Sequence, residues 1–174
     1  MARNDKHSAV RLERTIPASP HSVYRAWLEP SLLRRWLAPG GLEVKRVEID
    51  ERVGGHFRIW HADSDSDAGG FDCELLELVP DQRIVFRWGF VGPQRRDGPA
   101  YDSLLTITLR EAPGGATALT LVHERLEQLA EAMPHVAGKV GLGWELVLEK
   151  LTITMGTAGQ KGASAPSRSR SRSA

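Results

Sequence analysis

His123 is the side chain best placed for acid–base chemistry. The segment ATALTLVHE alternates so that His123 follows Leu119 and Leu121 on one face of a predicted strand. A histidine on an inward face could exchange a proton with a bound molecule near neutral pH. It could equally serve a structural role, with its ring bonded to the backbone or to a neighbour such as Glu124. We favour the structural role because no second acid or base is evident to share a proton-transfer cycle, and we assign no catalytic residue.

The tract DSDSDAGGFDCE resembles a calcium-binding loop in the spacing of its acids. Asp63, Asp65 and Asp67 occupy positions one, three and five, and Glu74 occupies position twelve. Position six is Ala68, where the sharp turn of such a loop needs glycine, and predicted strands rather than helices flank the tract. Runs of Asp, Ser and Gly are typical of hairpin turns. We therefore interpret the tract DSDSDAGG as a turn and predict no metal and no cofactor.

Cys73 is the single cysteine, which excludes an intramolecular disulfide and favours a reducing compartment. We interpret it as a buried structural thiol, because no Cys-His-Asn arrangement is recognisable around it. No glycine-rich phosphate loop is present. No apolar run approaches the roughly 20 residues of a membrane helix, and the polar start is unlike a signal peptide. We expect a cytoplasmic protein without membrane insertion.

Large apolar side chains fall on the faces predicted to point inward. Any one of them could simply fill a core, but aromatic groups together with a few polar ones commonly line small-molecule pockets. As a set they predict a ligand-binding cavity. The predicted ligand-binding residues are Trp36, Phe57, Ile59, Phe86, Trp88, Leu105, Leu121, His123, Trp144 and Leu148.

An antiparallel sheet is predicted to position these side chains. Short runs with period-two alternation are separated by Gly, Pro and Asp turn signals. The predicted strands are residues 10–18, 42–50, 56–61, 71–79, 83–90, 103–109 and 116–124, with short helices at 20–28 and 31–37 between the first two. In the third strand, Phe57 and Ile59 oppose His56, Arg58 and Trp60, which we place on the outer face.

The periodicity becomes helical after Leu126. A short helix is predicted over 126–133, where Pro134 ends it, and a long helix follows. Its apolar stripe is Val136, Val140, Trp144, Val147, Leu148 and Leu151. A helix of some 20 residues is about 30 Å long, enough to cross the domain. We expect a flexible N-terminus at 1–9, one domain at 10–155, and a disordered Ser/Arg-rich tail at 156–174.

Five strings in this order resemble the family of activator of heat-shock-protein-90 ATPase homologues. They are IPASPHSVYRAWLEPSLLRRWLAP, VGGHFRIW, PDQRIVFRW, SLLTITL, and LTLVHE paired with GWELVLEKL. The family lies within the START and polyketide-cyclase-like superfamily. The resemblance implies an α+β helix-grip fold: a curved antiparallel seven-stranded sheet on a long C-terminal helix, often around an apolar cavity. Two features depart from the family, the longer and more apolar segment between His123 and Gly143 and the Ser/Arg tail.

Three functions stay open at this point. The first is binding of a small apolar or amphipathic molecule between the sheet and the terminal helix. The second is a co-chaperone-like module that stimulates a chaperone ATPase, and the third is a cyclase-like enzyme. Nucleic-acid binding is not expected, because removing Lys161, Arg168, Arg170 and Arg172 of the tail leaves 19 basic against 22 acidic residues.

Overall fold

The alternating segments fold into one antiparallel sheet. The computed structural model describes residues 9–64, 66–93 and 101–162. The strands are β1 (Ala9–Ile16), β2 (Glu43–Ile49), β3 (His56–Asp63), β4 (Ser66–Val79), β5 (Arg83–Trp88), β6 (Phe90–Val91), β7 (Ser103–Ala112) and β8 (Ala116–Glu124). Their order across the sheet is β1-β8-β7-β5-β4-β3-β2, and the two-residue β6 pairs with β4. The predicted seven-stranded α+β fold is confirmed, with β6 as a short addition.

Two short helices follow β1 and three elements follow β8. The helices are α1 (Pro20–Leu28), α2 (Pro30–Leu33), α3 (Glu127–Ala132), α4 (Pro134–Ala137) and α5 (Val140–Gly162). Ser19 caps α1 by accepting a hydrogen bond from the backbone N–H of Ser22, and a proline begins both α1 and α2. These local signals explain where α1 and α2 begin.

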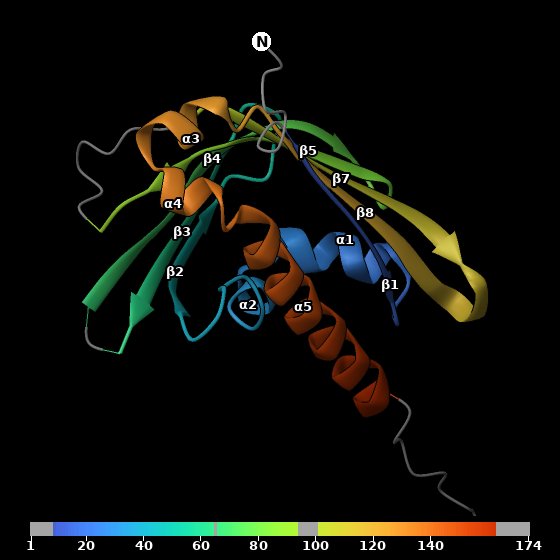
Figure 1. Ribbon diagram of the computed structural model, residues 1–174. Coiled ribbons are helices and arrows are strands. Elements are labelled where there is room, and N and C mark those ends of the chain that lie inside the picture. The colour runs from blue at the N-terminus through green and yellow to red at the C-terminus, as the bar shows by residue number, and fades with distance from the viewer. Residues whose placement is uncertain (1–8, 65, 94–100, 163–174) are drawn as a thin grey trace, which may run out of the picture.

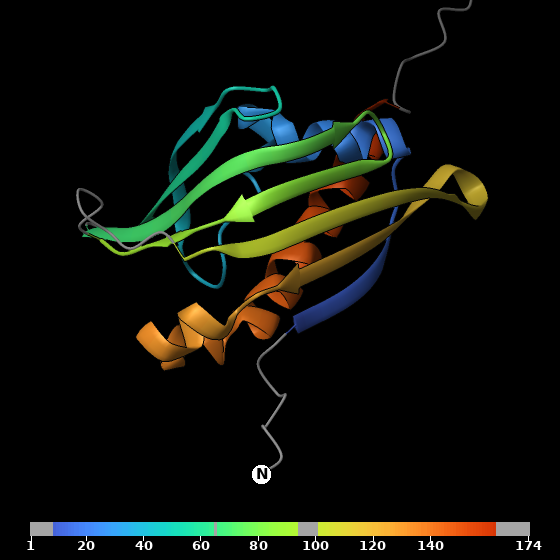
Figure 2. The same ribbon diagram turned by 90° about the horizontal axis from the view of Figure 1, so that it is seen from above.

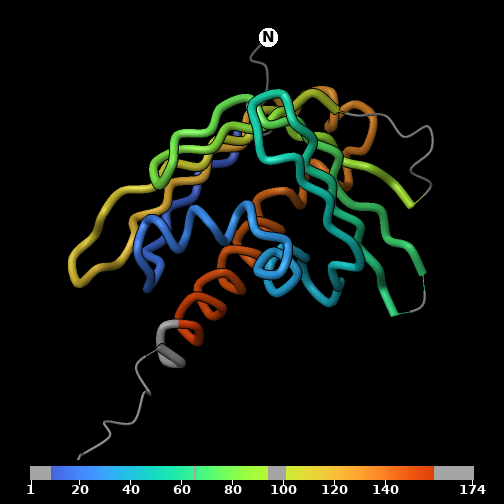
Figure 3. The backbone as a smooth tube through the Cα atoms, turned by 180° about the vertical axis from the view of Figure 1, so that it is seen from behind, coloured from blue at the N-terminus to red at the C-terminus, as the bar shows by residue number. Residues whose placement is uncertain are grey.

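The sheet arches over α5, which crosses its concave face beside α1 and α2 (Figures 1 and 3). Seen from above, the helix runs diagonally beneath the strands (Figure 2). Leu148 and Leu151 of α5 are fully buried, while Ile153 on the other side is 62% exposed. Burial of this one apolar stripe is the main force that holds the helix to the sheet.

The ends of α5 differ from the prediction. Gly138 follows α4 in a turn, so the long helix begins at Val140 rather than near Val136. At the other end it continues to Gly162, into the segment predicted to be disordered. Extending an existing helix fixes one residue per new hydrogen bond, so it needs little packing. The rest of that segment, residues 163–174, lies outside the described residues, as do residues 1–8 of the predicted flexible N-terminus.

The β3–β4 hairpin is longer than the sequence suggests. The tract that we interpret as a turn is largely part of β4, with Asp63 opposite Ser66 and Trp60 opposite Gly70. Gly69 and Gly70 both have positive φ angles, and a Cβ at Gly70 would lie 2.0 Å from the carbonyl oxygen of Ile59. Glycine at this point lets the two backbones approach closely, so the strands continue through a tract whose composition favours a loop.

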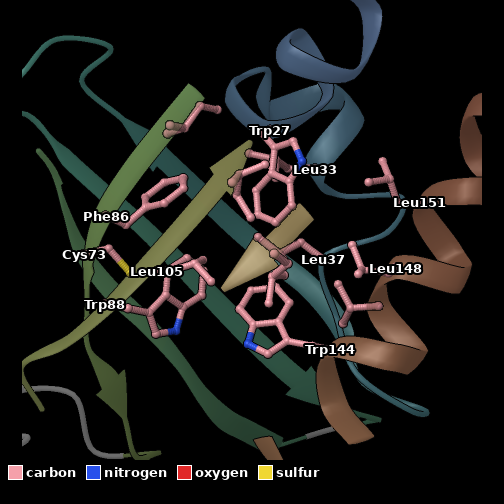
Figure 4. Close-up of a cluster of buried hydrophobic side chains, with 14 of the residues drawn as sticks. Trp27, Leu33, Leu37, Cys73, Phe86, Trp88, Leu105, Trp144, Leu148 and Leu151 are labelled. Carbon is pink, nitrogen blue, oxygen red and sulfur yellow. The ribbon is translucent and has the colours of Figure 1, made fainter. Parts of the chain in front are cut away.

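Aromatic rings fill the space between the sheet and the helices. Trp27 of α1 lies 4.7 Å from Trp36, and Trp88 of β5 lies 5.3 Å from Trp144 of α5, between ring centroids. Figure 4 shows Phe86 and Trp88 of β5 facing Trp27 and Trp144 across this cluster. Trp144, on the predicted apolar stripe of the long helix, thus packs against Trp88 on the inward face of β5. The centre of the fold is a packed aromatic core.

Candidate functional site

A pocket of about 540 Å³ lies at one end of the concave face. One wall comes from the sheet, with His61 on β3, Phe71 on β4 and Phe90 on β6. The facing wall comes from the first turns of α5, with Trp144 and Val147. The loop 37–42 after α2, Met133 and the short helix α4 complete it. The volume is in the range that small-molecule sites occupy.

The lining of this pocket is apolar with three titratable side chains. They are His61, His135 and Lys139, and no Asp or Glu occurs among the described residues that line it. His61 is 4% exposed, and its Nε2 lies 2.8 Å from the carbonyl oxygen of Leu37. The pocket is therefore an apolar surface that carries one lysine and two histidines and no acidic side chain among its described residues.

Lys150 fixes one rim of the pocket. Its Nζ donates to the carbonyl oxygens of Ala38, at 2.6 Å, and Gly40, at 2.8 Å. These two acceptors belong to the loop that joins α2 to β2, so one side chain of α5 ties this loop to the terminal helix. Hydrogen bonds from a charged donor are stronger than neutral ones. The tie positions Pro39 and Gly40 at the edge of the pocket.

His123 lies directly behind the pocket wall. Its ring is fully buried and stacks on Phe90 with an interplanar angle of 10°. The indole Nε1 of Trp144 donates to its Nδ1 at 3.0 Å. Its Nε2 lies 2.7 Å from Oγ of Ser103, and that hydroxyl donates to the carbonyl oxygen of Trp88 at 2.8 Å. The neighbours that satisfy His123 are thus Ser103 and Trp144, rather than Glu124.

The directions of these hydrogen bonds determine the tautomer of His123. An indole N–H can only donate, so Nδ1 must be the acceptor and the neutral ring carries its proton on Nε2. Nε2–H then donates to Ser103, whose own proton is committed to the backbone. Burial also lowers the pKa of His123 to about 3, which keeps the ring neutral. Although Ser103 and His123 are a serine–histidine pair, His123 cannot act as a base toward Ser103 in this arrangement.

Two other indole N–H groups have no acceptor among the described residues. Both Trp27 Nε1 and Trp88 Nε1 are buried within the aromatic core. An unsatisfied buried donor costs about 1–3 kcal/mol. His123, by contrast, has hydrogen bonds at both ring nitrogens. The apolar packing of the Trp27 and Trp88 rings must offset the free energy lost at their unpaired N–H groups.

The structure places most of the predicted ligand-binding residues in the core rather than at the pocket. Trp144 borders the pocket, whereas the other nine do not. These nine are at most 1% exposed: Trp36, Phe57, Ile59, Phe86, Trp88, Leu105, Leu121, His123 and Leu148. Their inward orientation is confirmed, but they pack against one another and leave the hollow at the end of the sheet. The pocket therefore lies between the sheet and the start of α5, beside rather than within the set of residues predicted to line it.

Several pocket residues were missed in the sequence. The alternation of Phe57 and Ile59 continues to His61, so the inward position of that histidine was available from the pattern. Phe71 lies opposite Ile59 in the β3–β4 register, which no local pattern reveals. Leu142 is 57% exposed and lies off the buried stripe of α5, so its place in the pocket wall depends on how the helix docks.

The outer face of the sheet carries charges in pairs. As predicted, His56, Arg58 and Trp60 lie there, opposite the buried Phe57 and Ile59. Arg58 bonds to Asp72 across the β3–β4 pair at 3.2 Å, and the guanidinium of Arg46 lies over the ring of Trp60. Surface pairs of this kind contribute little to stability individually.

One aspartate of the acid-rich tract, Asp65, lies outside the described residues. Within the described residues, no group of three or more His, Cys, Asp or Glu side chains is placed to hold a metal ion. Asp67 instead pairs with Lys45 at 2.7 Å. Cys73 is a free thiol that is 4% exposed, so its predicted burial is confirmed. In the same described part of the chain, no helix is long and apolar enough to cross a membrane.

Comparisons with known proteins agree with this architecture. The chain is similar to a protein from Chromobacterium violaceum of known crystal structure, with 32% identity over 85% of this chain and 96% of that one, and a TM-score of 0.66. A Mesorhizobium loti protein is 29% identical over 86% and 97% of the two chains, with a TM-score of 0.64. An AHSA1-like protein from Aeromonas hydrophila, 19% identical over 87% and 94%, shares the fold with a TM-score of 0.68. No curated protein sequence matches the chain.

The sequence model of one family covers most of the chain. It is described as activator of Hsp90 ATPase homolog 1-like protein, and it matches residues 17–156. This range runs from the end of β1 to the middle of α5, so it includes both walls of the pocket. With its helix-grip fold, the chain belongs to the activator of Hsp90 ATPase homolog 1-like family.

Proposed function

We propose that this protein binds a small apolar or amphipathic molecule in the pocket between β3, β4, β6 and the start of α5. The observation that carries the proposal is the pocket itself, about 540 Å³ in volume and lined mainly by apolar side chains. Binding sites for small molecules are typically concave, apolar and supplied with a few polar groups. Here His61, His135 and Lys139 are those polar groups.

The packed core supports a preformed site. Trp144 is buried on the side that contacts Trp88, and its edge also borders the pocket. Lys150 and its two carbonyl acceptors hold the rim loop in place. A site whose walls are already fixed loses little conformational freedom when a ligand enters, which favours affinity.

A co-chaperone-like interaction module is the alternative function. The filled centre of the fold favours it, because the aromatic core leaves no room for a ligand beneath the middle of the sheet. The description of the family points in the same direction. The exposed Leu142 and Leu146 on α5 could contact a protein as readily as a small molecule. Stimulation of a chaperone ATPase that persists when the pocket is blocked would favour this alternative.

The cyclase-like reading has less support. It requires a polar group that can exchange protons inside the site, and His123 was the candidate. The ring of His123 is neutral, and both of its nitrogens are hydrogen-bonded behind the pocket wall. It therefore cannot accept a proton from Ser103. We therefore propose binding rather than proton transfer as the role of this region.

Substitution of Gly143 tests the pocket directly. Gly143 lies in α5 and borders the pocket, and a Cβ added there would meet no atom within 4 Å. Gly143→Leu should fill part of the space, whereas Gly143→Ala should leave most of it open. Both should be at least as stable as the wild type, because glycine inside a helix costs about 0.5–1 kcal/mol relative to alanine.

The readout is binding of two neutral apolar probes, N-phenyl-1-naphthylamine and 1-dodecanol, followed by fluorescence and by calorimetry. We expect saturable binding to the wild type and to Gly143→Ala, and a loss of at least about tenfold in affinity for Gly143→Leu, equivalent to about 1.4 kcal/mol. If neither probe saturates the wild type, or if Gly143→Leu binds as well as Gly143→Ala, the pocket is not the binding site.

A further inference from the structure

We propose that the pocket selects an amphiphile with an anionic head, of the carboxylate type, which lies beside Lys139 while a single apolar chain fills the space between Phe71 and α5. This inference rests on the proposed function and specifies the class of ligand. It follows from how charge is distributed around the pocket, one step at a time.

The first step is the position of Lys139. Of the lysines whose side chains the structure describes, Lys45 pairs with Asp67 and Lys150 donates to two carbonyl oxygens. Lys139 is exposed at the pocket and has no side-chain partner within the described residues. An ammonium group at the edge of an apolar pocket, without a carboxylate to neutralise it, is available to a ligand.

The second step is the absence of competing negative charge. No Asp or Glu occurs among the described residues that line the pocket, and the first turn of α5 contains no acidic residue. The start of this 23-residue helix presents the positive end of its dipole on the same side as Lys139. His135 adds an imidazole that can donate a hydrogen bond. An anionic head would meet favourable charge here, and a cationic head would meet repulsion.

The third step is the apolar part. The sheet contributes Phe71 and Phe90, and the helical side contributes Val136, Leu142, Trp144 and Leu146; together they form a surface that cannot satisfy polar groups. Placing a second polar group there would cost free energy, because a buried polar group needs a hydrogen-bond partner. The charge is thus confined to one rim, and the matching ligand has its polar group at one end.

Three probes that share a twelve-carbon chain separate the head from the tail. They are dodecanoate, 1-dodecanol and dodecyltrimethylammonium, each used below its aggregation concentration and titrated by calorimetry. The proteins are the wild type, Lys139→Gln, and the control Lys45→Gln, which removes the same charge from a lysine that does not border the pocket. Each titration is repeated at low salt and at roughly 1 M salt, where the screening length falls to about 3 Å.

We expect the wild type to bind dodecanoate about fivefold more tightly than 1-dodecanol, and dodecyltrimethylammonium most weakly. Lys139→Gln should lose this preference and keep its affinity for 1-dodecanol, while Lys45→Gln should behave as the wild type. High salt should reduce the preference in the wild type. The inference would be overturned by equal binding of dodecanoate and 1-dodecanol, by tighter binding of dodecyltrimethylammonium, or by a preference for dodecanoate that survives Lys139→Gln. None of these results would contradict the proposed binding site itself. No binding of any probe would overturn the proposed function itself.

Discussion

Acidification of the protein tests whether His123 is held neutral in the core. Burial lowers its pKa from 6.5 to about 3 in the folded protein, whereas the unfolded chain keeps a value near 6.5. Between these two values the unfolded chain binds a proton that the folded protein does not. The free energy of unfolding must therefore fall as pH falls through this window. The contribution of the neutral His123 ring to stability is fully present above pH 6.5.

The size of the effect follows from the same two values. Each pH unit within the window contributes about 1.4 kcal/mol, so roughly 2 kcal/mol is lost on going to about pH 5. His123→Gln cannot take up this proton. It should cost about 1–3 kcal/mol near neutral pH, because one of the bonds to Ser103 and Trp144 is lost. The wild type and the variant should thus have similar stability near pH 5. Below that pH the variant should be the more stable of the two.

Urea unfolding followed by circular dichroism, at a series of pH values between about 7.5 and 4.5, measures this difference. Titrations of all other groups occur in both proteins and cancel. Ile107→Val is the matched control, since it loses about 0.5–1.5 kcal/mol in the buried face of β7 without changing a titratable group. Its curve should run parallel to that of the wild type. If the His123→Gln curve also runs parallel, the ring is not held neutral by burial.

Substitutions at Gly70 and Trp144 test the packing around the pocket. Gly70→Ala should lower the free energy of unfolding by more than about 1 kcal/mol and shift the urea midpoint, because its φ is +150° and its Cβ would meet a carbonyl oxygen at 2.0 Å; Gly41→Ala, in open space, should change it little. Trp144→Ala should cost about 3–5 kcal/mol through lost packing, whereas Trp144→Phe should cost about 1–3 kcal/mol by leaving Nδ1 of His123 without a donor. Equal losses for the two Trp144 variants would contradict the role given to the indole N–H.

The fold was largely predictable because its signals are local. Alternation in the segments that become β5, β7 and β8 matches the buried faces of those strands closely. The stripe of α5 from Val140 to Leu151 is likewise buried as its spacing predicts. The β3–β4 hairpin shows the limit of this approach, since composition favoured a turn where two glycines with positive φ instead allow close pairing.

The position of the pocket was less predictable than the fold. A periodic pattern reports which face of an element is buried, and it cannot report whether facing side chains meet or leave a gap. Trp88 and Trp144 meet, so the middle of the sheet is filled. The gap instead lies between β3, β4 and β6 and the start of α5, beside the loop 37–42. Its location depends on long-range docking that the local sequence does not encode.

The hydrogen bonds of His123 explain why the core and the pocket can have separate roles. A neutral ring with both nitrogens bonded stabilises the junction of β8, β7 and α5 without exposing a charge to the pocket. The polar groups that face a ligand, such as Lys139, then lie on the rim, where they stay hydrated at little cost in stability. Changes in the core should therefore act on folding, and changes at the rim should act on affinity. Trp144 is the exception, because one edge of its ring bonds His123 while another borders the pocket.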